Sequence, residues 1–105
     1  MEVDCIEANI EEASQVLKAI SNPRRLLVFC ALCGGEKCVG DLEEIVGISQ
    51  SALSQHLAKL RDDKLVKTRR DAQTIYYSVS SIAVHELLCC LNTIFSQNKT
   101  SPAVE

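Results

Sequence analysis

The sequence has no long hydrophobic run, and its longest uninterrupted apolar stretch, residues 26–33, is only eight residues. A helix that crosses a membrane needs about 20 such residues. The first residues also lack the positive charge of a secretory or mitochondrial leader, and five of the first twelve are acidic instead. We therefore expect no membrane segment and a location in the cytoplasm.

A catalytic pattern is absent as well. The sequence shows no Ser-His-Asp-like spacing, no glycine-rich phosphate loop and no paired carboxylates. A chain of 105 residues, 47% hydrophobic and 24% charged, suits one small domain and leaves little room for a deep substrate cavity. We expect one domain over residues 1–97 and a polar tail over 98–105, with no enzyme activity, no cofactor and no small-molecule substrate.

Positive charge is scarce overall, because the chain has 11 basic and 14 acidic residues and a formal net charge of -3. The distribution of charge matters more than the sum. Residues 59–70 hold six of the basic residues and only two acidic ones, Asp62 and Asp63. Such a basic segment in an acidic chain is typical of a local contact with nucleic acid.

Apolar residues at spacings of three and four predict a first helix. Its apolar positions are Ile6, Ile10, Ala13, Leu17 and Ile20. Asn22 is a candidate N-cap for a second helix, and Pro23 suits its first position. In this second helix, which Gly34–Gly35 ends, four residues are expected to face inward. They are Leu26, Leu27, Cys30 and Cys33.

The middle of the chain predicts two short helices joined by a tight turn. The first runs over Val39–Val46 and ends at Gly47. Ser49 is placed to cap the next helix, over Gln50–Asp62. That helix has one narrow apolar stripe, Leu53, Leu57 and Leu60, and its other side is polar but nearly uncharged.

After the fourth helix the pattern changes to β-branched and aromatic residues. Leu65–Arg70 and Thr74–Val79 predict the strands of a β-hairpin, with residues 71–73 between them. Ser80 or Ser81 then caps a last helix with a broad apolar face. The members of that face are Val84, Leu87, Leu88, Leu91, Ile94 and Phe95.

This order of elements predicts a mainly α fold with a β-hairpin wing, a winged helix-turn-helix of about five helices and a two-stranded wing. In such a fold, Gln50 and Gln55 could pair with adenine in the major groove, and cations at the helix end and on the hairpin could neutralise phosphates. The predicted DNA contacts are Ser49, Gln50, Ser51, Ser54, Gln55, His56, Lys59, Arg61, Arg69, Arg70, Gln73 and Thr74. The plainer interpretation is an ordinary solvated surface.

One reading helix makes a small footprint on DNA, which favours a homodimer. The first and last helices have apolar faces wider than a small core requires, so a two-fold dimer could pair them. We expect this dimer to bind double-stranded DNA at two half-sites about 34 Å apart. The alternative is that both apolar faces are buried completely within one monomer.

Three segments together resemble the ArsR/SmtB family of winged-helix regulators, in the branch that includes NolR, HlyU, SqrR and BigR. They are Glu36–Leu42, Ser49–Leu57 and Arg69–Ser78, and the resemblance covers residues 10–97. It implies a dimeric transcriptional regulator, usually a repressor, with the helix from Gln50 in the major groove and the hairpin as the wing.

The resemblance also implies metal or metalloid sites that can be compared with this sequence. The arsenic-type site has two cysteines around one residue, and here Cys38 is followed by Gly40 in the second position. The zinc-type site of the last helix begins with an Asp and a His two residues apart, and the corresponding positions here are Ser81 and Ala83. We therefore expect no metal site, and a metal-responsive repressor using Cys38 or the Cys30/Cys33 pair stays an alternative.

Cys30, Cys33, Cys89 and Cys90 are candidate regulatory thiols. The spacing of Cys30 and Cys33 matches a redox motif, but it lies within a helix, so packing thiols are the plainer interpretation. The resemblance implies a reactive cysteine at Cys30, and its partner position is Ser96 here. A response to thiol oxidants or reactive sulfur is thus a hypothesis that depends on the offsets between helices.

The main rival interpretation is a helical module that binds a protein partner and never contacts DNA. Salt dependence separates the two, because each phosphate contact adds about 0.9 to the slope of log affinity against log salt.

Overall fold

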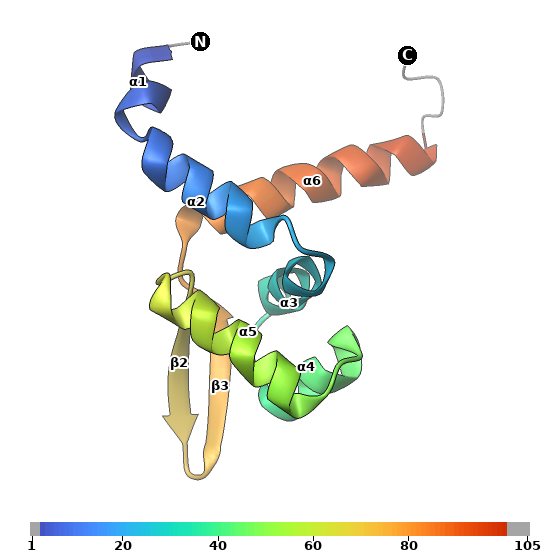
Figure 1. Ribbon diagram of the computed structural model, residues 1–105. Coiled ribbons are helices and arrows are strands. Elements are labelled where there is room, and N and C mark those ends of the chain that lie inside the picture. The colour runs from blue at the N-terminus through green and yellow to red at the C-terminus, as the bar shows by residue number, and fades with distance from the viewer. Residues whose placement is uncertain (1–2, 101–105) are drawn as a thin grey trace.

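The computed structural model describes residues 3–100, with side chains from Ile6 to Ser96. The elements follow one another as α1 (Val3–Ala8), α2 (Ile10–Ile20), α3 (Pro23–Cys33), β1 (Lys37–Cys38), α4 (Val39–Val46), α5 (Gln50–Asp62), β2 (Val66–Asp71), β3 (Thr74–Val79) and α6 (Ile82–Thr100). Figure 1 shows a helical body from which the hairpin of β2 and β3 projects. The expected mainly α fold with a hairpin wing is therefore confirmed.

The prediction of one first helix was wrong, because the chain breaks at Asn9 between α1 and α2. Asparagine side chains compete with the helical backbone for hydrogen bonds, which favours them at helix starts over helix interiors. Asn9 is the N-cap residue of α2, and its carbonyl accepts the amide of Ala13 at 2.9 Å. The described residues thus form six helices where about five were expected.

The wing also has one strand more than expected. β1 pairs antiparallel with β3, with Lys37 opposite Tyr77 and Cys38 opposite Tyr76, and the strand order is β1-β3-β2. A strand of two residues is too short for an alternating pattern, so only its pairing with β3 reveals it.

Local capping signals set the other boundaries as predicted. The Asn22 side chain accepts the amides of Arg24 and Arg25, at 2.9 and 3.2 Å, at the start of α3. Ser81, and not Ser80, caps α6 by accepting the amide of Val84 at 3.2 Å. α4 ends at Gly47, whose φ of 76° is a left-handed conformation that glycine adopts without strain.

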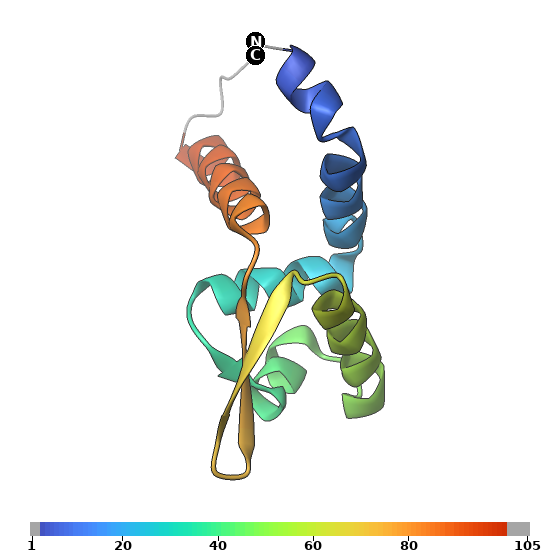
Figure 2. The same cartoon turned by 90° about the vertical axis from the view of Figure 1, so that its left-hand side faces the viewer.

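The core lies where the helices α2 to α6 and the base of the sheet meet. Its largest fully buried side chains are Phe29, Leu42, Leu53, Leu57, Leu60, Val28 and Val84. The stripe predicted for α5 is therefore its buried face. Figures 1 and 2 place α5 and the hairpin at one end of the molecule, and α2 and α6 at the other.

The inward face predicted for α3 was wrong at two of its four positions. Leu26 and Cys33 are half-buried against the core, but Leu27 is 41% exposed and Cys30 is also exposed. Val28, Phe29 and Leu32 are buried in their place. Residues 26–33 are all apolar, so periodicity could not select one face of this helix. Packing against α4, β3, α2 and α6 selects it instead.

Candidate nucleic-acid interface

The recognition face of α5, defined here as Gln50, Ser51, Ser54 and Gln55, is exposed along the helix. It lies outward because Leu53, Leu57 and Leu60, all at most 1% exposed, anchor the opposite side in the core. Hydroxyl and amide groups on the first two turns of an exposed helix can donate to and accept from base edges. The structure therefore brings these four predicted residues together on one free surface.

Ser49 is the N-cap residue of α5. Its Oγ accepts the amide of Ala52 at 3.2 Å and lies 3.4 Å from the Oγ of Ser51. This cap fixes the first turn of the helix, from which Gln50 and Ser51 project.

His56 is only partly exposed, and its Nδ1 accepts a hydrogen bond from Arg25 Nε at 3.2 Å. Burial, together with the positive charge of Arg25, lowers the pKa of His56 below its ordinary value. The ring is therefore a neutral acceptor that joins α3 to α5, and one of its nitrogens is occupied within the protein.

The wing carries Arg69, whose guanidinium is already paired. Its Nε and Nη2 each lie 2.8 Å from a carboxylate oxygen of Glu36, and its Cζ lies 4.9 Å from the centre of the Tyr76 ring. The hydrogen bond from Arg69 lowers the pKa of Glu36, and the carboxylate raises the pKa of Arg69. Both groups stay charged at neutral pH.

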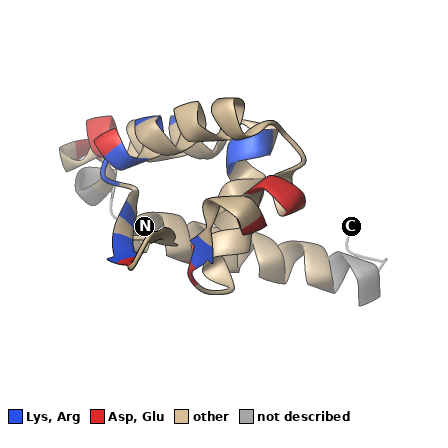
Figure 3. Cartoon of the chain, turned by 90° about the horizontal axis from the view of Figure 1, so that it is seen from below, with Lys and Arg blue, Asp and Glu red and all other residues tan. Residues whose placement is uncertain are grey.

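The other predicted cations lie near the end of α5 and on the wing. Lys59 forms an ion pair with Asp63 at 3.6 Å, and its side chain remains 58% exposed. Arg61, Arg70, Gln73 and Thr74 are exposed. Seen from below in Figure 3, the basic end of α5 and the basic strand of the hairpin lie on the same side of the chain.

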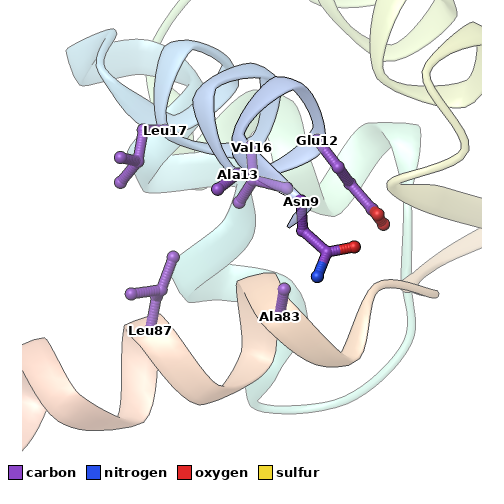
Figure 4. Close-up of a pocket in the computed structure, with 7 residues that line it drawn as sticks. All are labelled: Asn9, Glu12, Ala13, Val16, Leu17, Ala83 and Leu87. Atoms are coloured by element: carbon purple, nitrogen blue, oxygen red, sulfur yellow. The ribbon is translucent and has the colours of Figure 1, made fainter. Parts of the chain in front are cut away.

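At the opposite end, α2 and α6 border an open apolar groove of about 440 Å³. It is lined by Asn9, Glu12, Ala13, Val16, Leu17, Ala83 and Leu87. Figure 4 shows the apolar side chains of the two helices directed toward the space between them. Among the described residues, most exposed large hydrophobic side chains lie on α1, α2 and α6: Ile6, Ile10, Leu17, Ile82, Ile94 and Phe95.

Three of the four candidate thiols line one cavity of about 280 Å³ between α3 and α6. Cys30 and Cys33 come from α3 and Cys89 from α6, where the Sγ of Cys89 lies 3.8 Å from His85 Nδ1. Burial raises the pKa of the Cys33 thiol, and the neighbouring Cys30 and Cys89 raise it further. Cys90 is exposed and does not line this cavity.

Within the part of the chain that the structure describes, no group of three or more His, Cys, Asp or Glu side chains is arranged to hold a metal ion. Over the same residues, no helix has the length and apolar character needed to cross a membrane.

Sequence reasoning missed Arg24, Arg25, Glu36 and Tyr76 as supports of the site. Arg24 Nη1 donates to the carbonyl of Val46, the last residue of α4, at 2.9 Å. Two arginines in the first turn of a helix oppose the helix dipole, which is a local signal that they have partners elsewhere. Glu36 and Tyr76 gave no such signal.

Comparison with known proteins identifies relatives among bacterial regulatory proteins. The model for bacterial regulatory proteins of the arsR family matches residues 22–68. The chain is 54% identical to nodulation protein NolR of Rhizobium meliloti, over 84% of this chain and 72% of that protein. It is 43% identical to the HTH-type transcriptional regulator YgaV of Escherichia coli, over 86% and 92%.

A solved structure is also similar over most of its length. The transcriptional repressor BigR of Xylella fastidiosa matches with a TM-score of 0.84 and 39% identity, over 90% of this chain and 97% of that one. The family match covers α3, α4 and α5, the elements that build and support the recognition face. The chain therefore belongs to the arsR family of bacterial regulatory proteins and is a transcriptional regulator with a winged-helix fold.

Proposed function

We propose that this regulator is a homodimeric repressor that binds an inverted-repeat operator in double-stranded DNA. One observation carries the proposal: an uncharged polar face of α5 and the exposed wing cations lie toward one end of the molecule. Among the described residues, most of the exposed large apolar side chains lie on α1, α2 and α6, toward the other end. A protein that binds DNA at one end and its own copy at the other needs this separation of surfaces.

In the proposed complex, α5 lies in the major groove and its recognition face reads base edges. The side-chain amides of Gln50 and Gln55 have a donor and an acceptor that complement the acceptor and donor of adenine in the major groove. Ser51 and Ser54 reach bases or phosphates. Lys59, Arg61 and Arg70 neutralise phosphates, and Gln73 and Thr74 at the wing tip contact the backbone. The exposure of each of these side chains supports these proposed roles.

The second copy is proposed to cover the groove between α2 and α6. Ile10 and Leu17 on α2 are 53% and 54% exposed, and Phe95 on α6 is 61% exposed. Side chains of this size lose contact with water on pairing, which stabilises association by about 25 cal/mol per Å² of apolar area buried. Two-fold pairing would set the two α5 helices about one DNA turn apart.

The test is selection of bound sequences from a random duplex library, followed by binding measurements over a range of salt. The expected result is enrichment of inverted repeats whose half-sites are about 10 base pairs apart, with affinity that falls steeply as salt rises. If no DNA sequence is enriched, and any residual binding to DNA does not change with salt, the result would favour the module that binds only protein partners.

We further propose that thiol oxidation regulates the same protein. The cavity between α3 and α6 holds Cys89 near His85, a base that can accept its proton, and faces it with Cys30 and Cys33. A hydroperoxide would oxidise the Cys89 thiol to a sulfenic acid, and attack by a thiol of α3 would form a disulfide with release of water. Such a bond would join α6 to α3, the helix that holds His56 of α5 through Arg25.

A further inference from the structure

Arg69 and Glu36 join the two edges of the wing sheet. Because the strand order is β1-β3-β2, Glu36, which immediately precedes β1, and Arg69 on β2 lie on either side of β3. Two hydrogen bonds of 2.8 Å nevertheless connect them, although 33 residues separate them in the sequence. The pair therefore crosses the middle strand.

Tyr76 completes this arrangement from the middle strand. It is opposite Arg69 on one side and opposite Cys38 of β1 on the other. The Arg69 guanidinium lies over its ring, with 4.9 Å from Cζ to the ring centre. Glu36, Tyr76 and Arg69 thus bring one residue from each edge and one from the centre of the sheet into a single contact, called here the wing clamp.

The wing clamp lies where the pairing of the sheet is shortest. β1 is only two residues long, and it joins β3 through Lys37 and Cys38 alone, whereas β2 and β3 pair over six positions. Beyond β1 the hairpin projects from the body, as Figure 2 shows. A clamp at the level of Tyr76 therefore fixes the hairpin where the sheet narrows from three strands to two.

Arg70 contrasts with its neighbour. Successive residues of a strand point to opposite faces, so Arg70 lies on the other face of β2. It is exposed, and within residues 6–96 it takes part in neither of the two ion pairs that the structure contains. Its whole guanidinium is available to a phosphate, whereas one edge of Arg69 is taken by Glu36 and one face by Tyr76.

We infer that Arg69 is a positioning residue, which with Glu36 and Tyr76 sets the angle of the wing, and that Arg70 is the wing arginine that contacts DNA phosphate. This inference rests on the proposed DNA binding. It changes the role of Arg69 from an anchor on DNA to a support inside the protein.

Four variants of the full chain test it: Glu36→Gln, Arg69→Gln, the charge swap Glu36→Arg with Arg69→Glu, and Arg70→Gln. DNA affinity is measured against salt, and hydrogen exchange of the β2 and β3 amides is measured without DNA. Arg70→Gln should lower the salt slope by about 0.9 for each protomer, or about 1.8 for the proposed dimer, and leave amide exchange unchanged. Arg69→Gln should weaken binding about tenfold, the scale of one lost contact, keep the slope and speed exchange.

The charge swap gives the sharpest comparison, because it keeps both the ion pair and the net charge. A supporting pair predicts that the swap regains much of the affinity lost in Arg69→Gln and restores slow exchange. An anchor on DNA predicts binding weaker than in Arg69→Gln, since a glutamate then faces phosphate.

Three results would overturn the inference. They are a lower salt slope in Arg69→Gln, unchanged amide exchange in Arg69→Gln, and a gain in DNA affinity in Glu36→Gln larger than the gain in the matched exposed variant Glu44→Gln. Absence of salt-dependent DNA binding in the wild-type protein would instead refute the proposed function. The exchange measurement would still decide whether the clamp holds the wing.

Discussion

The Nε of Arg25 lies 3.2 Å from the Nδ1 of His56, so the first turn of α3 holds the middle of α5 across 31 residues of sequence. The bond needs a neutral imidazole, because a protonated ring offers no acceptor at Nδ1. Protonation of His56 would thus remove the bond and place a second positive charge beside Arg25. The hydrogen bond between α3 and α5 therefore depends on the charge of His56.

This link predicts a pH dependence of stability. Burial, and then Arg25, lower the pKa of His56 from its ordinary 6.5, so the unfolded chain takes up the proton at higher pH than the folded chain. His56 then contributes stability that is complete above pH 6.5 and is lost as the pH falls through its lower folded value.

Urea unfolding of the wild-type protein and His56→Gln, at several pH values from neutral to mildly acidic, measures this contribution. Glutamine keeps an acceptor for Arg25 but does not titrate in this range. The variant should lose less stability on acidification. Equal losses in the two proteins would contradict the assigned role of His56.

Gln55→Ala should relax base preference on DNA. Loss of a side chain that pairs with a base edge costs about 1–3 kcal/mol of discrimination at one position of the operator. The matched control is Gln15→Ala, an exposed glutamine on α2. Repeated library selection should show a degenerate position for Gln55→Ala alone, and an unchanged motif would exclude Gln55 as a reading residue.

Leu17→Asp should dissociate the proposed dimer. Leu17 is 54% exposed on α2 and lines the groove against α6, so a buried carboxylate there would be costly. Ile45→Asp on α4, at a residue 47% exposed, is the control outside this surface. Sedimentation equilibrium should report a folded monomer for Leu17→Asp and a dimer for Ile45→Asp, whereas a dimer for both would place the interface elsewhere.

Ala72→Gly should stabilise the wing. Ala72 follows β2 in the hairpin turn with φ of 58°, a left-handed conformation that costs a residue with a Cβ about 1 kcal/mol. The same substitution in an exposed helical position, Ala58→Gly in α5, should destabilise by about 1 kcal/mol. Chemical denaturation measures both, and a loss of stability in Ala72→Gly would contradict the strain assigned to this turn.

Cys89→Ser should abolish the proposed oxidative response, and the adjacent Cys90→Ser should preserve it. Cys89 lines the cavity with Cys30 and Cys33, and Cys90 does not. After treatment with a hydroperoxide, peptide mass mapping should find a disulfide between Cys89 and α3 in the wild-type protein and in Cys90→Ser. DNA affinity unchanged by oxidation in the wild-type protein would refute thiol regulation.

Local signals determined much of this protein in advance. The bounds of α4 and α5 follow from Gly47 and Ser49, because a left-handed turn and a capping side chain act within a few residues of sequence. The outward face of α5 follows from the three leucines of its narrow stripe, which leave only one side to bury. The family resemblance rests on segments of this same region, Glu36–Leu42 and Ser49–Leu57, and on Arg69–Ser78 of the hairpin.

Tertiary structure decided the features that depend on residues far apart. The buried face of α3 was set by packing, since residues 26–33 are apolar on every side. The strand β1, the pairs Arg25–His56 and Glu36–Arg69, and the meeting of Cys89 with α3 all join segments separated by about 30 residues or more. Sequence periodicity describes one element at a time, whereas such contacts depend on the register and rotation of two elements against each other.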